Sequence, residues 1–128
     1  MTVAYVDSSC LVAIAFTEPG AQRLAARLAA FDRLVSSNLL EAELRAAFAR
    51  EAVPADPEPL MSGLTWVYPD RPLTREFQVI AAAGYLRGAD LWHLACALFL
   101  APAGAGLVFL TLDKRQAQVA SVLGFARA

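Results

Sequence analysis

Two hydrophobic patterns alternate along the chain and predict alternating strands and helices. Short, almost uninterrupted apolar runs such as Val-Ala-Tyr-Val are typical of buried strands, whereas longer runs rich in Ala, Leu and Arg are typical of helices. We expect strands over residues 2–6, 34–36, 65–68 and 107–112, with a terminal edge strand over 125–127. We expect helices over residues 8–15, 21–31, 38–52, 74–86, 90–100 and 114–123. This alternation predicts an α/β fold with a small, mostly parallel sheet flanked by helices.

Capping and turn residues set the expected ends of these elements. Ser8 or Ser9 is expected to cap the first helix, and Asn38 with Glu41 matches a capping-box pattern. Thr74 is expected to cap its helix, and a glycine at 88 to break it. Prolines at 54, 57 and 59 predict a loop rather than a domain boundary, because neither flank is large enough to fold alone. We therefore expect one domain over residues 1–128.

Composition narrows the functional classes. The net charge of −1 excludes a general basic field that would hold nucleic acid non-specifically, so any such binding requires a local patch. Hydrophobic residues make up 58% of the chain, above the usual content of about 45–50%. That excess favours a face buried against another chain. The residues expected on this face are Val12, Phe16, Leu39 and Phe48.

Other sequence features indicate the cellular compartment in which we expect the protein. The apolar run over residues 91–101 is shorter than the membrane span of about 20 residues, and no signal-peptide pattern is present. Cys10 and Cys96 both lie in apolar surroundings, which favours reduced core residues over a disulfide. We expect a cytoplasmic protein without membrane contact.

Four acidic residues stand at or inside apolar segments, namely Asp7, Glu43, Asp90 and Asp113. Asp7 and Asp113 each follow a predicted strand directly, so both point to the carboxyl edge of the sheet, where ligands bind. Converging carboxylates would repel one another unless a cation neutralises them, and oxygen-rich sites suit Mg²⁺ or Mn²⁺. The set therefore indicates metal-dependent chemistry on phosphates.

Each acid also has a purely structural interpretation. Asp7 and Asp113 could cap the helices that follow, and Asp90 could favour the dipole of its own helix. Glu43 is different, because it shares the core-facing side of its helix with leucines and needs a partner there. Glu41, by contrast, stands four residues before Arg45 and is placed to form a surface pair.

The segments around these acids carry a family resemblance. They read Tyr-Val-Asp-Ser-Ser at 5–9, Glu-Leu-Arg-Ala at 43–46, Asp-Leu-Trp-His-Leu-Ala at 90–95 and Leu-Thr-Leu-Asp at 110–113. In order and spacing they resemble PIN-domain ribonucleases over nearly the whole chain, most closely the VapC-like toxins of toxin–antitoxin pairs. The resemblance implies a three-layer fold, commonly a homodimer. The implied ligands of Mg²⁺ or Mn²⁺ are Asp7, Glu43, Asp90 and Asp113, with Ser9 and Thr111 beside the metal.

The resemblance implies an activity and partners. The expected reaction is hydrolysis of RNA phosphodiesters by metal-activated water, leaving 5′-phosphate ends. A VapB-like antitoxin is expected to cover the groove. The departures from the family pattern are Trp92, where Ala is commoner, and the Pro-rich stretch after Glu51; they bear on the substrate groove and the partner contacts.

Weaker candidates surround the acids. Arg87 and Lys114 are candidate phosphate contacts, although each could simply be a solvated charge. His93 is best interpreted as a core histidine. Because it lies one turn from Asp90 in the same predicted helix, it could also orient the Asp90 carboxylate. A zinc site from Asp90, His93 and the two cysteines lacks any supporting spacing.

Two other classes of function stay open. A non-catalytic interaction module would use the acids only as caps and would hold no metal. An aspartyl phosphotransfer domain would also place Asp7 after the first strand, but its phosphatase form expects a second acid where Ser9 stands.

Overall fold

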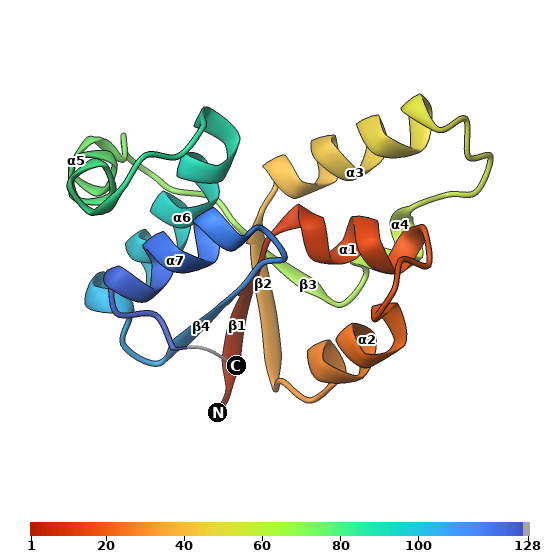
Figure 1. The fold of residues 1–128 in the computed structure, drawn as a ribbon, viewed down its shortest axis with the longest axis horizontal. Coiled ribbons are helices and arrows are strands. Elements are labelled where there is room, and N and C mark those ends of the chain that lie inside the picture. Colours follow the sequence, from red (N-terminus) through yellow and green to blue (C-terminus); the bar gives the residue numbers. More distant parts are fainter. Residues whose placement is uncertain (127–128) are drawn as a thin grey trace.

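A four-stranded parallel sheet forms the centre of the molecule, with helices packed on both faces (Figure 1). The computed structural model describes residues 1–126. The strands are β1 (Val3–Val6), β2 (Arg33–Ser37), β3 (Leu64–Val67) and β4 (Leu107–Leu110). They lie in the order β3-β2-β1-β4, and each neighbouring pair is parallel. The predicted α/β fold is confirmed.

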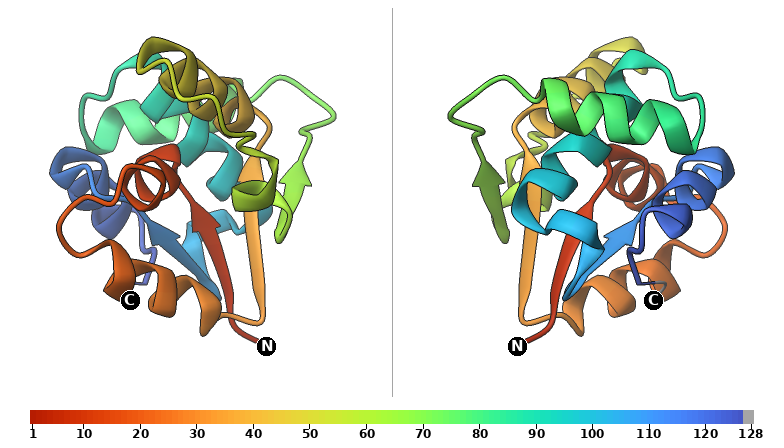
Figure 2. Two further views of the ribbon diagram at one scale, coloured as in Figure 1. Left: turned by 90° about the vertical axis from the view of Figure 1, so that its right-hand side faces the viewer. Right: turned by 90° about the vertical axis from the view of Figure 1, so that its left-hand side faces the viewer.

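The helices form the two outer layers. On one face lie α1 (Ser8–Ala15), α2 (Ala21–Ala29), α3 (Leu39–Arg50) and the short α4 (Glu58–Met61). On the other lie α5 (Thr74–Ala83), α6 (Gly88–Leu100) and α7 (Lys114–Val122), and a 3₁₀ turn, η1 (Pro102–Gly104), precedes β4. Figure 2 shows the first layer in front in one view and the second in the other. Among the described residues, no helix has the length and apolar character needed to cross a bilayer.

The pleat of β1 divides the core into two hydrophobic clusters. Side chains of a strand alternate between its faces, so Tyr5 packs with the α5–α7 layer, whereas Ala4 and Val6 pack with the α1–α4 layer. The first cluster includes Leu94 of α6, and the second includes Leu44 of α3. Tyr5 is fully buried. The strand thus directs a phenol from the centre of the sheet toward α6.

Two predicted helix boundaries were wrong for backbone reasons. The helix expected over 74–86 ends at Ala83, because Gly84 has an extended backbone and residues 84–87 form no regular secondary structure. Gly88 then begins α6 instead of breaking a helix. The Pro-rich segment expected as a loop contains α4, in which Pro59 occupies the first turn. A missing N–H is tolerated in a first turn, since that group has no partner within the helix.

The expected caps were wrong at α1 and α5 and right in position at α3. Asp7, rather than Ser8 or Ser9, caps α1 by accepting a hydrogen bond from a backbone N–H. Asn38 stands at the N-cap of α3, as predicted, but it makes no side-chain cap bond; its side-chain amide donates to Glu41 Oε1 at 3.1 Å instead. Leu73 stands at the N-cap of α5, again without a side-chain cap. The expected ion pair from Arg45 to Glu41 is present at 2.8 Å.

The face expected to meet a partner is partly used by the chain itself. Phe48 is only 8% exposed and packs against Phe16, with ring centroids 5.8 Å apart, because α3 lies on α1. Val12 also packs on this cluster. Phe48 is therefore a core residue, and its place in the predicted partner face was wrong.

Two smaller predictions concern the cysteines and the C-terminus. Cys10 and Cys96 are free and buried, as predicted. The predicted terminal strand over 125–127 is reduced to a single parallel bridge between Ala126 and Val108. Arg127 lies outside the described residues.

Candidate functional site

Asp7 lies at the carboxyl end of β1, beside the end of β4. Its backbone N–H donates to Leu110 O at 2.9 Å, which ties the two strand ends together. The side chain is 3% exposed. Asp7 Oδ2 accepts hydrogen bonds from the Ser9 N–H at 3.1 Å and from Thr111 Oγ1 at 3.3 Å. Within the described part of the chain, Asp7 Oδ1 is buried and has no hydrogen-bond partner.

Asp113 closes the neighbouring loop. It caps α7 by accepting the Gln116 N–H on Oδ1 at 2.8 Å, and its own N–H donates to Thr111 Oγ1 at 3.1 Å. Ser9 joins the two loops, because its hydroxyl lies 3.3 Å from Thr111 Oγ1 and accepts the Leu112 N–H at 3.0 Å. The hydroxyls of Ser9 and Thr111 thus fix the two strand ends that carry Asp7 and Asp113.

Asp90, in the first turn of α6, completes the cluster from the other layer. Burial raises the pKa of Asp90, and three negative charges raise it further: those of Asp7, Asp113 and Glu43. The positive charge of Arg87 lowers the pKa of Asp90. Like charges that disfavour ionisation must lie close together. The structure therefore brings the four predicted acids into one electrostatic environment above β1 and β4.

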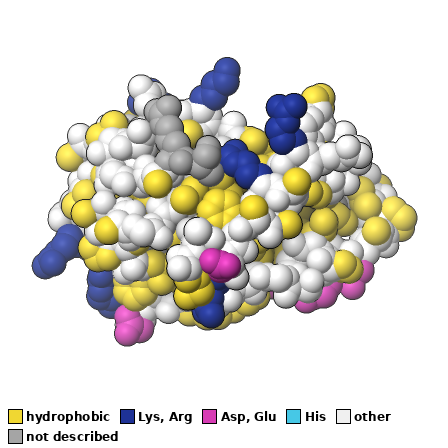
Figure 3. Space-filling view, turned by 90° about the horizontal axis from the view of Figure 1, so that it is seen from below, with side chains coloured by type: hydrophobic (Ala, Val, Ile, Leu, Met, Phe, Trp, Pro, Cys, Tyr) yellow, Lys and Arg dark blue, Asp and Glu magenta, His cyan; other side chains and the backbone are white. Residues whose placement is uncertain are grey.

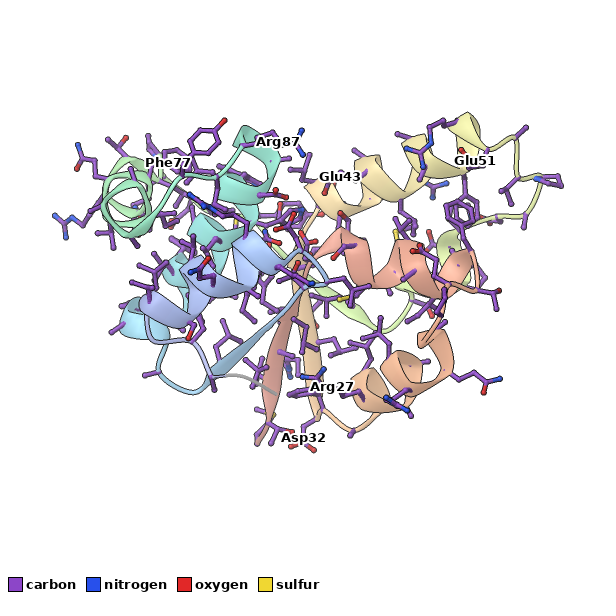
Figure 4. All side chains as sticks on the ribbon, in the orientation of Figure 1. Arg27, Asp32, Glu43, Glu51, Phe77 and Arg87 are labelled. Carbon is purple, nitrogen blue, oxygen red and sulfur yellow. The ribbon has the colours of Figure 1, made fainter. Side chains whose placement is uncertain are left out.

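Glu43 enters this cluster from α3 on the opposite side. Figure 4 shows it facing the middle of the molecule, across from the segment that carries Arg87. Glu43 Oε1 lies 2.6 Å from His93 Nε2. The suggestion that His93 orients Asp90 was therefore wrong: the ring points along the helix face toward α3, so its partner is Glu43. This contact also gives Glu43 the partner that its core-facing position requires.

The arrangement matches the rule for open parallel sheets. Ligands of such sheets bind outside the carboxyl ends of the strands, where the strand order changes direction. Here β1 is followed by β2 on one side, while β4 returns on the other, so the Asp7 and Asp113 loops flank that point. Seen from the opposite end, the surface shows mainly hydrophobic and uncharged groups, with Lys, Arg, Asp and Glu side chains scattered among them (Figure 3).

Residues 4–122 match the PIN domain family. The chain belongs to the PIN domain family. Curated proteins and solved structures gave no match. PIN domains are a nuclease family, typically of ribonucleases, and they generally use divalent metals.

The acidic side chains of this PIN domain are chemically suited to bind a divalent metal. Their donors are carboxylate oxygens, which Mg²⁺ and Mn²⁺ prefer, and the buried Asp7 Oδ1 lacks any partner among residues 1–126. In that same range, no three His, Cys, Asp or Glu side chains are arranged so that they could hold one ion together. The acids are thus gathered without sharing a common coordination centre.

The two thiols do not resemble metal ligands. Burial raises the pKa of Cys10 to about 12 and that of Cys96 to about 11. Metal-binding cysteines are thiolates. Both residues therefore stay protonated near neutral pH and serve the core of the PIN domain.

The two candidate phosphate contacts are exposed at the rim. Arg87 precedes α6 and acts on Asp90. Lys114 begins α7, directly after Asp113, and lines a shallow hollow with Arg27. Among the described residues, neither Arg87 nor Lys114 forms an ion pair within 4.0 Å. Both side chains are therefore available to a ligand.

Sequence reasoning missed Gln116. This side chain is fully buried between α6 and α7. Its Oε1 accepts a hydrogen bond from Thr111 Oγ1 at 2.7 Å, and its Nε2 donates to Asp90 O at 3.2 Å. Gln116 thereby links the loop after β4 to the first turn of α6. A polar residue at a core-facing position of the last helix was the available signal.

Tyr5 and Ser37 were also missed. The Tyr5 hydroxyl lies 2.7 Å from His93 Nδ1 and accepts the Ser37 N–H at 3.0 Å. Ser37 Oγ in turn accepts from Trp92 Nε1 at 2.8 Å. Tyr5 occupies a strand position at which an aromatic residue is expected from packing alone, so nothing in the sequence distinguishes a role of its hydroxyl from the packing of its ring.

Proposed function

We propose that this PIN domain is a Mg²⁺- or Mn²⁺-dependent endoribonuclease and the toxin of a VapBC-type toxin–antitoxin pair. The chain is proposed to act as a single nuclease domain over residues 1–128. The observation that carries the proposal is the partnerless, buried Asp7 Oδ1, which lies among acids that raise the pKa of Asp90. A buried oxygen without a partner is costly unless a ligand satisfies it. Membership of a nuclease family supports the same assignment.

The proposed metal ligands are Asp7, Glu43, Asp90 and Asp113; since no three such side chains converge on one point among the described residues, the proposal requires these carboxylates to draw together when the ion binds. When bound, Mg²⁺ or Mn²⁺ neutralises developing charge on the phosphate and lowers the pKa of the attacking water. Ser9 and Thr111 hold the Asp7 carboxylate through Oδ2, which leaves Oδ1 for the metal. Gln116 fixes the backbone of Asp90.

Substrate binding is assigned to the rim of the cluster. Arg87 and Lys114 are exposed, lie next to Asp90 and Asp113 in the chain, and are free of ion pairs in the described structure. Arginine can bind a phosphate through two parallel hydrogen bonds. They are the proposed contacts for RNA phosphates flanking the scissile bond.

A VapB-like antitoxin is the proposed protein partner, and the active assembly is proposed to be a homodimer. The hydrophobic content of 58% supports extensive contact with other chains. Several large apolar side chains are exposed, including Tyr68, Tyr85 and Val122.

The test is cleavage of RNA by the purified, partner-free chain with Mg²⁺ or Mn²⁺. Parallel reactions contain EDTA or the Asp7→Asn/Asp90→Asn double variant. Cleavage that disappears in both supports the proposal. Activity that persists in the double variant indicates a contaminant or another site, and a chain that neither binds metal nor cleaves RNA is a non-catalytic module.

A further inference from the structure

A continuous chain of hydrogen bonds runs from the centre of the sheet to Glu43. The Ser37 N–H donates to the Tyr5 hydroxyl at 3.0 Å, and that hydroxyl lies 2.7 Å from His93 Nδ1. On the other side of the ring, His93 Nε2 lies 2.6 Å from Glu43 Oε1. These residues come from β1, β2, α3 and α6, so the chain crosses both layers of the fold.

One assignment of donors and acceptors satisfies every group in this hydrogen-bond chain. The Tyr5 oxygen accepts the Ser37 N–H, and in this assignment the phenolic hydrogen is donated to His93 Nδ1. Burial, above all, raises the pKa of Tyr5, so its hydroxyl keeps that hydrogen. His93 Nε2 then carries the ring hydrogen and donates it to the Glu43 carboxylate.

The hydrogen-bond chain is buried and rigid at its inner end, whereas its outer end is partly exposed to solvent. Tyr5 and His93 are both fully buried, and Tyr5 stacks on Phe109 with ring centroids 5.3 Å apart. A close-packed ring cannot rotate freely. The Glu43 side chain is 28% exposed, and within the described residues only its Oε1 is engaged. Its Oε2 therefore has no hydrogen-bond partner among the described residues, and the Glu43 charge acts on Asp90 of the acidic cluster.

A second contact from the same helix fixes the start of α3. Trp92 Nε1 donates to Ser37 Oγ at 2.8 Å, and that oxygen also accepts the Leu39 N–H at 3.2 Å. Trp92 and His93 thus hold the first turn of α3 and the Glu43 side chain from adjacent positions of α6. Trp92, the departure from the family pattern, has a structural role in this attachment.

We propose that His93 and Tyr5 are positioning residues for Glu43: Tyr5 fixes the ring of His93, and His93 holds Glu43 Oε1 so that Oε2 faces the metal. The inference rests on the proposed function only in that Glu43 ligates the ion. Residues that orient metal ligands through a hydrogen bond commonly alter metal affinity or activity by about 10- to 100-fold.

The hydrogen-bond chain can be tested without metal by nitrogen and proton NMR of ¹⁵N-histidine-labelled protein. His93 is the only histidine in the sequence, so its signals need no assignment. We expect a slowly exchanging Nε2–H, a shift of the Nδ1 signal in Tyr5→Phe and a shift of the Nε2–H signal in Glu43→Gln. A rapidly exchanging ring, or signals unmoved by both variants, would overturn the proposal.

The positioning role is tested by Mn²⁺ titration of folded variants, monitored by calorimetry. His93→Ala should weaken Mn²⁺ binding about 10- to 100-fold, and Tyr5→Phe should weaken it less. His93→Gln, whose amide can donate to Glu43 in place of Nε2–H, should restore most of the affinity. Ile80→Val removes one methylene from the same buried cluster without touching this chain and should leave Mn²⁺ affinity unchanged.

The outcomes separate this inference from the proposed function. Equal Mn²⁺ affinity in His93→Ala and wild type, with only a lower melting temperature, would reduce His93 to a core residue and overturn the positioning role. If His93→Ala does not fold, Tyr5→Phe and His93→Gln decide the same question. Absence of Mn²⁺ binding in the wild type contradicts the proposed function, whereas the NMR experiment still decides whether the hydrogen-bond chain exists.

Discussion

The carboxylate of Asp7 is the largest charge acting on Asp90: after burial, it contributes most to raising the pKa of that group. The two residues come from the end of β1 and the start of α6, 83 positions apart in the sequence. Folding therefore forces together two negative charges that are far apart in the unfolded chain. Such repulsion lowers the stability of the folded protein, which is a common cost of a ligand-binding site.

Removing the charge of Asp90 should stabilise the metal-free protein. Asp90→Asn relieves repulsion from the other acids, so we expect its melting temperature in EDTA to rise by a few degrees, while Mn²⁺ binding is lost. Calorimetric melting with and without Mn²⁺ measures both effects. The control is Asp70→Asn, an exposed aspartate remote in sequence from the site, which should change neither.

The pH dependence of that stabilisation has a definite sign. Because the folded-state pKa of Asp90 lies above the ordinary value of 3.8, the folded protein binds the proton more tightly than the unfolded chain does. Stability of the wild type relative to Asp90→Asn should therefore fall as pH rises from 3.8 through the folded pKa, and stay level above it. A stabilising effect of Asp90→Asn that grows toward acidic pH would contradict the assignment.

The cap and ligand roles of Asp7 can be separated. Asparagine caps helices about as well as aspartate, so Asp7→Asn should keep the bond from the Ser9 N–H and change unfolding free energy by less than about 1 kcal/mol. Its Mn²⁺ affinity should nevertheless fall at least tenfold, or about 1.4 kcal/mol. Asp7→Ala should lose both the cap and the metal. Equal Mn²⁺ affinity in Asp7→Asn and wild type would leave Asp7 as a cap alone.

The sequence was sufficient to predict the layers and the carboxyl-edge acids, because these depend on local patterns. A buried strand followed directly by an acid, as at Asp7 and Asp113, has few alternatives in a parallel sheet. The structural interpretation of these two acids was also right, since each caps a helix while lying in the cluster. Capping and ligand binding use different oxygens of Asp7, so one role does not exclude the other.

The internal supports of the site could not be predicted. Gln116 and His93 act on residues from other elements, and nothing in local periodicity reveals which element will face them. His93 stands one turn from Asp90 in sequence, yet it bonds to Glu43, because packing of α6 against the sheet turns its ring toward α3. Such partners depend on helix rotation and register, which tertiary packing decides.

Gln116 should be required for stability of the site. Gln116→Leu removes the bond from the Thr111 hydroxyl to Gln116 Oε1 and the bond from Gln116 Nε2 to Asp90 O, and two lost hydrogen bonds cost about 1 to 3 kcal/mol together. Denaturant unfolding should show this loss. The matched control is Gln118→Leu on the exposed side of the same helix, for which we expect a much smaller change. Equal effects of the two substitutions would contradict the proposed role of Gln116.

Arg87 should contribute a phosphate contact. Arg87→Ala is expected to weaken binding of single-stranded RNA and to reduce the slope of log affinity against log salt by about 0.7, the value for one lost contact. Fluorescence anisotropy at several salt concentrations measures the slope, in EDTA to prevent cleavage. Arg23→Ala, an exposed arginine of α2 away from the acids, serves as control and should leave the slope unchanged. An unaltered slope for Arg87→Ala would assign the residue to the solvated surface.

The ends of the cleaved RNA report the nucleophile. Attack by water requires no ribose 2′-OH, so the products should carry 5′-phosphate and 3′-hydroxyl ends, and a substrate with 2′-deoxyribose at the cleaved position should still be cut. Mass spectrometry of the fragments distinguishes this from attack by the 2′-OH. Fragments that carry only 2′,3′-cyclic phosphate would contradict a water-based mechanism.

The central claim is that Asp7, Glu43, Asp90 and Asp113 together hold a divalent metal. The most direct measurement is calorimetric titration of the partner-free chain with Mn²⁺, beside the Asp7→Asn/Asp90→Asn double variant. We expect saturable binding to the wild type and none to the double variant, with both proteins folded by circular dichroism. Equal binding to both, or no saturable binding to the folded wild type, would contradict the claim.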